Sequence, residues 1–414
     1  MTGSCANEDA ADVLPQSLVG QTHIVTGGDS SVGMAAVEAI ASAGATVIIA
    51  SRSSAKGEAA AERIRRETGA LVTFVPVDLA SFASVRRAAV RLRHVVSQAG
   101  NGRLDSLILC AGVLGVQGDA ADTWITAAGL ESTMMINYFS HALLVEELLP
   151  LLRASTARVV EVSSSASIYP CDWQGGPPSL SAERWLSECT SLANIAWASH
   201  TLPTGDSGMG LPAPSTYGLS KFAQVVHAKQ LAEREPSLLA FSVNPGLVSR
   251  GSTMVSKGVP AATEAEWCRW NDELYAHACP YTASQGAATL VYLATGDAVA
   301  LAASNGGFFA DCTVRDADLN DGARLHGGSA YASAFYNLTL DEIARGTRAE
   351  QLREVTGTAE FGKFTAIAGG SDRMAGWPLT VVQACALCGS VLLASGQLRR
   401  SRQRSRRPEA LLLM

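Results

Sequence analysis

The sequence predicts an α/β protein built on a doubly wound parallel sheet with helices on both faces. Short runs rich in β-branched and apolar residues alternate along the chain with stretches of helical periodicity. The apolar runs are continuous, which is typical of strands covered by helices on both sides. With 414 residues, 47% of them hydrophobic, the chain is long enough to bury such a core. Right-handed crossovers between the strands then give the doubly wound arrangement.

Six apolar runs are predicted to be buried strands, and the helical stretches lie between them. The runs are rich in Val, Ile and Leu, whereas the stretches between them are rich in Ala, Glu and Arg. The predicted strands cover residues 22–26, 46–50, 71–75, 104–110, 158–163 and 239–243, and the clearest helices cover 55–67 and 82–98.

The regular alternation also suggests how the chain is divided. The α/β domain is expected over residues 18–315, after a flexible N-terminal segment at 1–17. A long insertion at 166–215 interrupts the domain with several prolines and three tryptophans. A helical extension follows at 316–376, and an apolar segment with an arginine-rich tail occupies 377–414.

Charge and cysteine usage limit the partners and the compartment. The net charge of −6 at pH 7 argues against nucleic acid as a partner, because nucleic-acid-binding domains are usually basic. The nine cysteines are odd in number and widely spaced, which favours reduced thiols in a cytoplasmic protein. The one C-x-x-C pair lies in an apolar run without a histidine nearby, so no metal site is predicted.

The C-terminal tail allows two interpretations. Residues 379–396 carry no formal charge over 18 positions, and the arginine-rich stretch 399–407 follows. One interpretation is a membrane anchor over 379–407, with the arginines at anionic lipid. The other is a helix that packs on the domain or on a second copy of the chain in a homodimer.

A glycine-rich turn after the first predicted strand is a candidate phosphate site. It reads Thr26-Gly-Gly-Asp-Ser-Ser-Val-Gly33 and leads directly into a predicted helix. Backbone N–H groups and the helix dipole at such a position favour a pyrophosphate. Gly27 permits the tight turn, and Gly33 permits close packing of the helix.

The end of the second predicted strand bears on which dinucleotide would bind. An acid there would accept hydrogen bonds from the adenosine ribose, but the sequence has Arg52 and no acid. A guanidinium suits a 2′-phosphate, so NADP(H) is favoured over NAD(H). Asp29 weighs against a phosphate, and a solvated arginine is the alternative interpretation.

Tyr217 and Lys221 are the sharpest chemical feature. Their i, i+4 spacing places both side chains on one face of a helix. An ammonium group near the phenol is expected to lower its pKa from about 10. The pair could then exchange a proton with a carbinol or carbonyl oxygen.

Together with other motifs, these residues resemble the short-chain dehydrogenase/reductase family over residues 18–312. The motifs follow the family's order: the turn at 26–33, Val77-Asp78-Leu79, Cys110-Ala111-Gly112, Asn137, Ser163-Ser164, Tyr217 with Lys221, and Asn244-Pro245-Gly246. Segments 56–60, 148–152 and 307–312 resemble the retinol-dehydrogenase-like and carbonyl-reductase-like branch. The resemblance implies a Rossmann fold and a nicotinamide cofactor.

The resemblance also implies roles for four catalytic residues. Tyr217 would be the general acid/base, and Lys221 would tune it and hold the nicotinamide ribose. Ser164 would hydrogen-bond the substrate oxygen. Asn137 would hold a water that relays protons past Lys221.

The cofactor would be held by backbone and side chains that follow the strands. Asp78 would contact the adenine, and Ala111 and Gly112 would line the cofactor. The complete predicted cofactor-binding set is Thr26, Gly27, Ser31, Val32, Gly33, Arg52, Asp78, Leu79, Cys110, Ala111, Gly112, Tyr217, Lys221, Pro245, Gly246 and Val248.

Three positions depart from the family pattern. Ser31 replaces the middle glycine of the first turn, Cys110 replaces an asparagine, and Arg250 stands where a threonine is usual. These departures keep a second hypothesis open, a non-catalytic dinucleotide-binding or scaffold protein that retains the fold. A relative of light-dependent protochlorophyllide reductase fits less well, because that group's cysteine signature near the tyrosine is missing.

The expected function is an NADP(H)-dependent oxidoreductase that interconverts a carbonyl and an alcohol. The insertion at 166–215 would border the substrate site, and Trp173, Trp185 and Trp197 could line an apolar pocket for a lipophilic small molecule. The alternative is that these tryptophans pack the insertion onto the domain.

Overall fold

The computed structural model describes residues 4–99, 102–113, 125–168, 195, 215–248, 281–316 and 329–356. The chain divides into two compact units, Met1–Gly362 and Lys363–Met414, and every described residue belongs to the first. The three tryptophans of the insertion, Arg250 and the tail at 377–414 lie outside the described residues.

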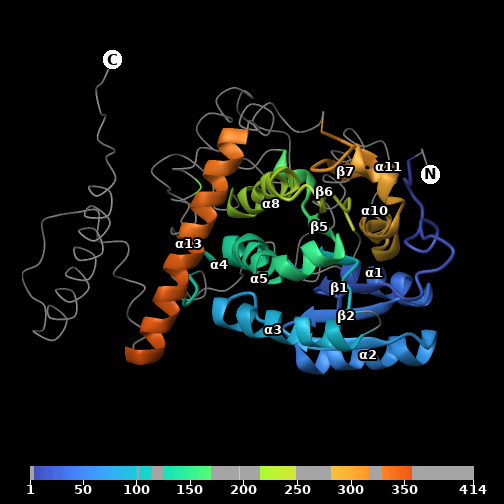
Figure 1. Cartoon of the computed structure of the whole chain (residues 1–414), viewed down its shortest axis with the longest axis horizontal. Coiled ribbons are helices and arrows are strands. Elements are labelled where there is room, and N and C mark those ends of the chain that lie inside the picture. Colours follow the sequence, from blue (N-terminus) through green and yellow to red (C-terminus); the bar gives the residue numbers. More distant parts are fainter. Residues whose placement is uncertain are drawn as a thin grey trace, which may run out of the picture. The chain divides into compact units, whose positions relative to one another are not determined.

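The described residues form an eight-stranded sheet with the order β3-β2-β1-β4-β5-β6-β7-β8. All neighbouring strands pair in parallel except β7 and β8, which are antiparallel. This arrangement confirms the doubly wound parallel sheet (Figure 1). The strands are β1 (Thr22–Thr26), β2 (Thr46–Ser51), β3 (Val72–Pro76), β4 (Ser106–Leu109), β5 (Arg158–Val162), β6 (Leu239–Val243), β7 (Phe308–Ala310) and β8 (Thr313–Val314).

Helices cover both faces of the sheet and divide the core into two clusters. The first cluster joins the sheet to α3 (Phe82–Gln98), α5 (Ser140–Ser155) and α8 (Ser215–Arg234). The second joins it to α1 (Ser31–Ser42), α2 (Ser54–Thr68) and α10 (Ala283–Thr295). Neighbouring strand residues alternate between the clusters, Ile24 in the first and Val25 in the second, because successive side chains of a strand point to opposite faces. Shorter helical segments are α4 (Ser132–Met134), η2 (Met135–Phe139), η3 (Ser165–Ser167) and α11 (Ala298–Ala302).

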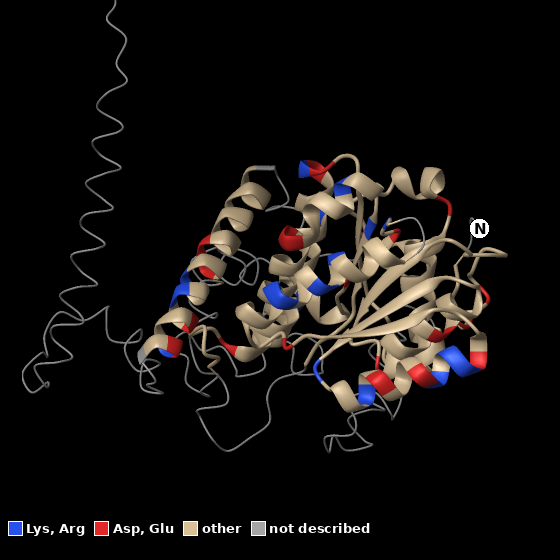
Figure 2. Ribbon diagram, turned by 60° about the horizontal axis from the view of Figure 1, so that its bottom comes forward, with Lys and Arg blue, Asp and Glu red and all other residues tan. Residues whose placement is uncertain are grey.

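Helix α3 shows how the sequence forms one of the helices that cover the sheet. The Ser81 hydroxyl caps its start by accepting a hydrogen bond from the Ser84 amide. Its buried side chains recur at helical spacing, at Val85, Ala89, Leu92 and Val96. Figure 2 shows the consequence for the whole fold: charged residues lie mainly on helices, whereas the strands are largely free of them.

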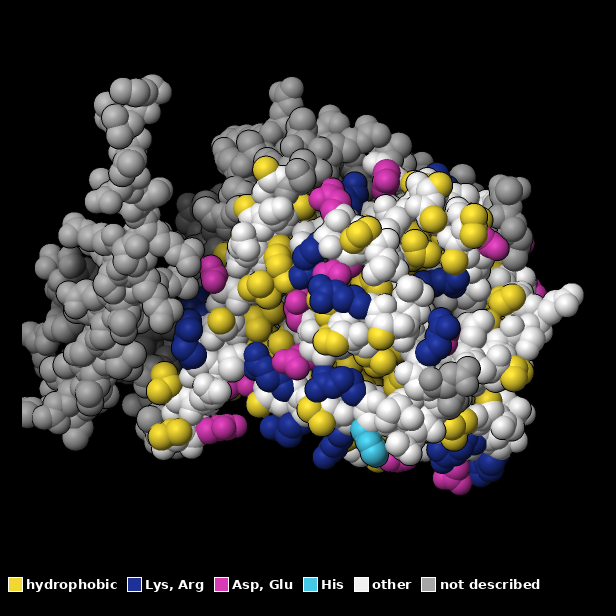
Figure 3. Space-filling view, in the orientation of Figure 1, with side chains coloured by type: hydrophobic (Ala, Val, Ile, Leu, Met, Phe, Trp, Pro, Cys, Tyr) yellow, Lys and Arg dark blue, Asp and Glu magenta, His cyan; other side chains and the backbone are white. Residues whose placement is uncertain are grey.

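The long helix α13 (Ser329–Thr356) packs against α8 and α3. Phe335 and Ile343 of this helix belong to the first core cluster, and Figure 3 shows hydrophobic side chains along the seam beside α13. The Glu350 carboxylate accepts hydrogen bonds from the Phe82 and Ala83 amides at 2.8 and 2.9 Å, so it caps α3. The helix lies within the stretch 316–376, where a helical extension was expected, and these contacts anchor it in the domain.

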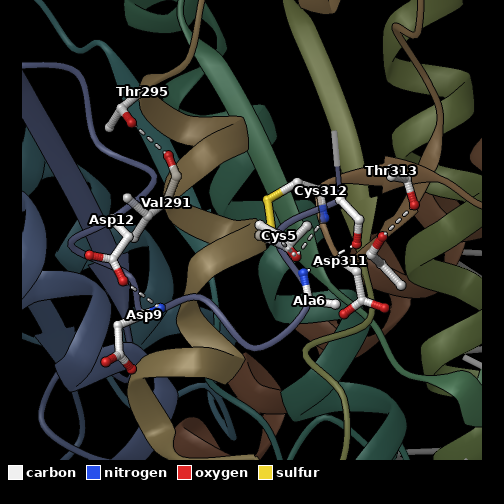
Figure 4. Close-up of a disulfide and its surroundings, with 12 residues drawn as sticks. Cys5, Ala6, Asp9, Asp12, Val291, Thr295, Asp311, Cys312 and Thr313 are labelled. Carbon is white, nitrogen blue, oxygen red and sulfur yellow. Dashed lines mark hydrogen bonds between the residues drawn. A yellow bond between two sulfur atoms is a disulfide. The ribbon is translucent and has the colours of Figure 1, made fainter. Parts of the chain in front are cut away.

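The N-terminal segment corrects two expectations. Cys5 and Cys312, separated by 307 residues, form a disulfide (Figure 4), so the prediction of reduced thiols is wrong for this pair. Residues 4–17 are not the free segment that was expected, because Cys5, Ala10 and Val13 are buried in the second core cluster. The Cys5 amide also donates to the Asp311 carbonyl at 2.9 Å. A disulfide removes the support that reduced thiols gave to a cytoplasmic location.

No helix among the described residues is both long enough and apolar enough to cross a membrane. The stretch at 379–407, for which a membrane anchor was expected, lies outside the described residues.

Candidate active site

The predicted site residues gather at the carboxyl ends of the parallel strands. The turn that begins at Thr26 follows β1, residues 110–113 follow β4, Ser163 and Ser164 follow β5, and residues 244–248 follow β6. Since β1, β4, β5 and β6 are consecutive neighbours in the sheet, these loops meet along one edge. Ligands of doubly wound sheets bind at this edge.

The turn after β1 has the backbone geometry of a phosphate cradle. Gly27 adopts a φ of +67°, in the left-handed region that favours glycine. A Cβ on Gly33 would lie 2.4 Å from the Gly27 carbonyl oxygen, so only glycine fits where α1 begins. Ser31, at the start of α1, holds a φ of +47°, and its buried hydroxyl oxygen has no hydrogen-bond partner among the described residues. A buried hydroxyl of this kind beside the N–H groups at the start of a helix fits a bound phosphate.

The positions expected near the adenosine lie at the ends of β2 and β3. Arg52 is exposed directly after β2. The Asp78 carboxylate accepts a hydrogen bond from the Ala80 amide at 3.0 Å, and the Leu79 carbonyl accepts one from the Ser140 hydroxyl at 2.6 Å. Arg52 is therefore open to a ligand, while Asp78 and Leu79 also shape their own turn. Val32 is half-buried against the second core cluster.

The loop after β4 approaches both the cradle and the catalytic helix. The Ala111 amide donates to the Thr26 hydroxyl at 3.0 Å. A Cβ on Gly112 would lie 3.3 Å from the Asn137 Oδ1 and 3.5 Å from the Lys221 Nζ, so glycine allows this close approach. Burial raises the pKa of the Cys110 thiol to about 12, although the Lys221 charge opposes the shift.

Asn137 lies in the π-helical turn η2 and braces this loop. Its Oδ1 accepts from the Val113 amide at 2.8 Å, and its Nδ2 donates to the Val113 carbonyl at 2.9 Å and to the Ser220 hydroxyl at 3.0 Å. Its main-chain carbonyl accepts from His141 and Gln224 at 2.9 and 3.0 Å. The structure thus gives Asn137 a bracing role, and the relay water remains a prediction.

Tyr217, Lys221 and Ser164 converge as expected from the sequence. Tyr217 and Lys221 come from the first turns of α8 and are 8% and 4% exposed. The Lys221 Nζ lies 5.5 Å from the centre of the Tyr217 ring and donates to the Val162 carbonyl at 2.8 Å. The Tyr217 hydroxyl makes a side-chain hydrogen bond with Ser164. A phenol, an amine and a hydroxyl from two separate segments therefore share one small volume.

The protonation of this group differs from the sequence expectation. Burial raises the pKa of Tyr217 to about 12, and the group that opposes the shift is Ser164. Burial also lowers the pKa of Lys221 to about 8. The expected lowering of the tyrosine pKa by the Lys221 ammonium is thus not found, because desolvation of the phenolate dominates and Ser164 is the group that opposes it.

Hydrogen bonds also fix α8 to the strand and loop beside it. The Ser163 hydroxyl donates to the Lys221 carbonyl at 2.8 Å. Glu161 on β5 and His227 on α8, both fully buried, are joined at 2.6 Å between Oε1 and Nδ1. This pair holds the catalytic helix against the central strand. Sequence reasoning missed both residues, since a lone acid in an apolar strand is its only signal.

The loop after β6 brings Pro245, Gly246 and Val248 to the same edge. Gly246 has a φ of +74°, and a Cβ there would lie 2.7 Å from the Tyr281 ring. Val248 pairs with Tyr281 in an isolated parallel bridge, and the Tyr281 hydroxyl donates to Asp311 at 2.9 Å. The loop is thereby tied to the segment that carries the disulfide.

Sequence reasoning also missed His141, which contacts two predicted site residues. Its ring lies between the Thr26 hydroxyl and the Asn137 carbonyl. The only signal was its position one helical turn after Asn137.

Comparisons with known proteins show the family to which the chain belongs. Residues 21–175 match the family model described as short chain dehydrogenase. The chain is 30% identical over 298 residues to a short chain dehydrogenase/reductase, dpchH, of Colletotrichum higginsianum, a match that covers 67% of this chain and 64% of that protein. It is also 30% identical over 248 residues to the short-chain dehydrogenase/reductase pyiH of Pyricularia grisea, covering 56% of this chain and 91% of that protein.

A solved structure shows the same fold. The crystal structure of an uncharacterized protein from Mycobacterium Paratuberculosis superposes with a TM-score of 0.53 at 24% identity, covering 81% of this chain and 97% of that one. With the family model and the match that covers 91% of pyiH, the ordered motifs at the sheet edge lead to one conclusion: this chain belongs to the short-chain dehydrogenase/reductase family.

Proposed function

We propose that the protein is an NADP(H)-dependent oxidoreductase that interconverts a carbonyl and an alcohol, with Tyr217 as general acid/base. The observation that carries the proposal is the convergence of Tyr217, Ser164 and Lys221 beside the glycine-rich cradle. A bound nicotinamide would supply the chemistry of hydride transfer. The cradle at 26–33, with its unpaired Ser31 hydroxyl, fits the pyrophosphate of such a cofactor.

Tyr217 is set up to give a proton to a substrate oxygen. With its pKa raised to about 12, the phenol is protonated at neutral pH and can donate as a carbonyl is reduced. Its bond to Ser164 places a second hydroxyl beside the same position. The oxygen of the substrate would lie between these two hydroxyl groups, where both donate as negative charge develops.

Lys221 supports this step through its charge. An ammonium group has three donors, and the Val162 carbonyl takes one, which leaves others for the ribose hydroxyls of the cofactor. The Lys221 pKa of about 8 means that the ammonium is present at neutral pH and is lost above it. Carbonyl reduction should therefore fall as the pH rises past about 8, through Lys221 rather than Tyr217.

The preference for NADP(H) rests on Arg52. Its guanidinium is exposed at the end of β2, where a 2′-phosphate would lie, and no acid follows that strand. The preference for a lipophilic substrate rests on the three tryptophans of the insertion in the sequence.

Titration with NADPH and NADH, followed by a panel of aromatic and aliphatic ketones and alcohols, tests the proposal. Wild-type protein should bind NADPH about tenfold more tightly than NADH, and Arg52→Ala should remove most of that difference. Tyr217→Phe should bind NADPH normally but lose turnover, whereas Tyr292→Phe on α10 serves as a matched control. If NADPH binds and no compound turns over, the non-catalytic hypothesis replaces this one.

The tail hypotheses are tested separately. A membrane anchor over 379–407 predicts that the full chain sediments with anionic vesicles and that a chain ending at 376 does not. Equal behaviour of the two chains would remove the anchor. A homodimer that depends on this segment would lose half its mass on the same truncation.

A further inference from the structure

His141 is a fully buried histidine that joins two parts of the candidate site. It lies on α5, one helical turn after Asn137, and is 0% exposed. Its Nδ1 is 2.9 Å from the Asn137 carbonyl oxygen, and its Nε2 is 3.0 Å from the Thr26 hydroxyl oxygen. Both ring nitrogens are therefore paired, each with a residue of the predicted site.

The chemistry of these partners fixes the tautomer of the ring. Burial lowers the pKa of His141 to about 4, so the imidazole is neutral at pH 7. A carbonyl oxygen can only accept, which places the ring proton on Nδ1. The Nε2 must then accept the Thr26 hydroxyl proton, and the Thr26 oxygen in turn accepts from the Ala111 amide.

One directed chain of hydrogen bonds thus crosses the site. It runs from the Ala111 amide to Thr26, from Thr26 to His141, and from His141 to the Asn137 carbonyl. The same carbonyl also accepts from Gln224 on the catalytic helix α8. Three segments, at the end of β1, after β4 and in η2, are therefore connected through this one ring.

We propose that His141 is a positioning residue that clamps the dinucleotide cradle to the Asn137 turn through its two ring nitrogens. The proposal rests on the proposed function. The bond to Thr26 fixes the position of the cradle and of the Ala111–Gly112 loop, which would hold the cofactor. The bond to Asn137 fixes the position of the loop at Val113 and of the first turns of α8, which carry Tyr217 and Lys221. The two sides therefore act on different steps, dinucleotide binding and turnover.

Two amide substitutions separate the two sides. His141→Asn has a short side chain whose amide N–H can replace the Nδ1 donor, so it keeps the Asn137 bond and loses the Thr26 bond. His141→Gln has a longer side chain whose carbonyl can replace the Nε2 acceptor, so it keeps Thr26 and loses Asn137. His94→Gln, at an exposed position on α3, is the matched control.

The expected result is a split between affinity and turnover. A buried hydrogen bond is worth about tenfold in an equilibrium or rate. His141→Asn should weaken NADPH binding about tenfold, measured by cofactor fluorescence, and keep kcat at saturating NADPH. His141→Gln should bind NADPH within about twofold of wild type and lose about tenfold in kcat. Equal losses in both variants, or none in either, would overturn the clamp and leave only a structural role.

A readout that needs no activity distinguishes the clamp from the proposed function. Exchange of the Ala111 amide hydrogen should be faster in His141→Asn and Thr26→Val, and unchanged in His141→Gln. If wild-type protein binds no dinucleotide, the proposed function fails, and this exchange measurement alone decides the clamp. An Ala111 amide that exchanges at the wild-type rate in His141→Asn would overturn it.

Discussion

Acidification should destabilise the fold through His23, a buried histidine on β1. Its side chain is 0% exposed and lies 2.7 Å from the Ser106 hydroxyl through Nδ1, while its Nε2 has no partner among the described residues. Burial lowers its pKa from 6.5 to about 3, and the positive charge of Arg158 adds to the shift. The perturbation that isolates this effect is His23→Asn, which can keep the bond to Ser106 and removes the titrating group.

The sign follows from where the protons bind. Below pH 6.5 the unfolded chain protonates His23, whereas the folded chain stays neutral down to about pH 3. The stabilisation is therefore fully present above pH 6.5 and is lost as the pH falls toward the folded value. Between pH 7 and about pH 4.5 the loss covers roughly two pH units, or about 3 kcal/mol of unfolding free energy.

Urea unfolding at the two pH values, followed by tryptophan fluorescence, measures this loss. The acid-induced loss should be smaller in His23→Asn than in wild type by about 3 kcal/mol, even if the variant is less stable at pH 7. The exposed His94→Asn should behave like wild type. An unchanged acid loss in His23→Asn would refute the reasoning, since the buried ring would then have no unusual proton affinity.

Two further predictions concern the cradle and the disulfide between Cys5 and Cys312. Gly33→Ala should weaken NADPH binding at least about tenfold by titration, because its methyl group would lie 2.4 Å from the Gly27 carbonyl oxygen. Wild-type affinity in that variant would show that the cradle does not hold the cofactor. Cys5→Ser should lower the free energy of unfolding by about 2–4 kcal/mol in urea because it removes the bond to Cys312, whereas Cys110→Ser should not share that loss. Equal stability of the Cys5 variant and wild type would contradict a stabilising role of this disulfide.

Most of the sheet could be predicted because the residues within each strand are themselves typical of a buried strand. The predicted strands at 22–26 and 239–243 coincide with β1 and β6, since each is a short run rich in apolar and β-branched residues that is almost completely buried. The predicted run at 104–110 was too long by two residues at its start and one at its end, because β4 begins at Ser106 and ends at Leu109, where the chain turns toward the cradle. The short strands β7 and β8 had no local signal of comparable length.

The site residues could be predicted from the spacing and order of the motifs, but their protonation states could not. The convergence of Tyr217, Ser164 and Lys221 follows from the strand order, because neighbouring strands bring their loops together. The raised Tyr217 pKa depends on complete burial, which the sequence does not display. The disulfide and the bond between His141 and Thr26 depend on contacts across 307 and 115 positions, which one sequence does not encode in any local pattern.

Isotope transfer tests most directly whether Tyr217 protonates a substrate oxygen beside a bound nicotinamide. NADPH deuterated at C4 would be incubated with the ketone panel, and the alcohol products analysed by mass spectrometry. We expect wild-type protein to place deuterium on the carbinol carbon, and Tyr217→Phe to do so at least about a hundredfold more slowly at unchanged NADPH affinity. Deuterium transfer at the same rate in both proteins would contradict the assignment of Tyr217, and NADPH binding without transfer to any ketone would contradict the proposed activity.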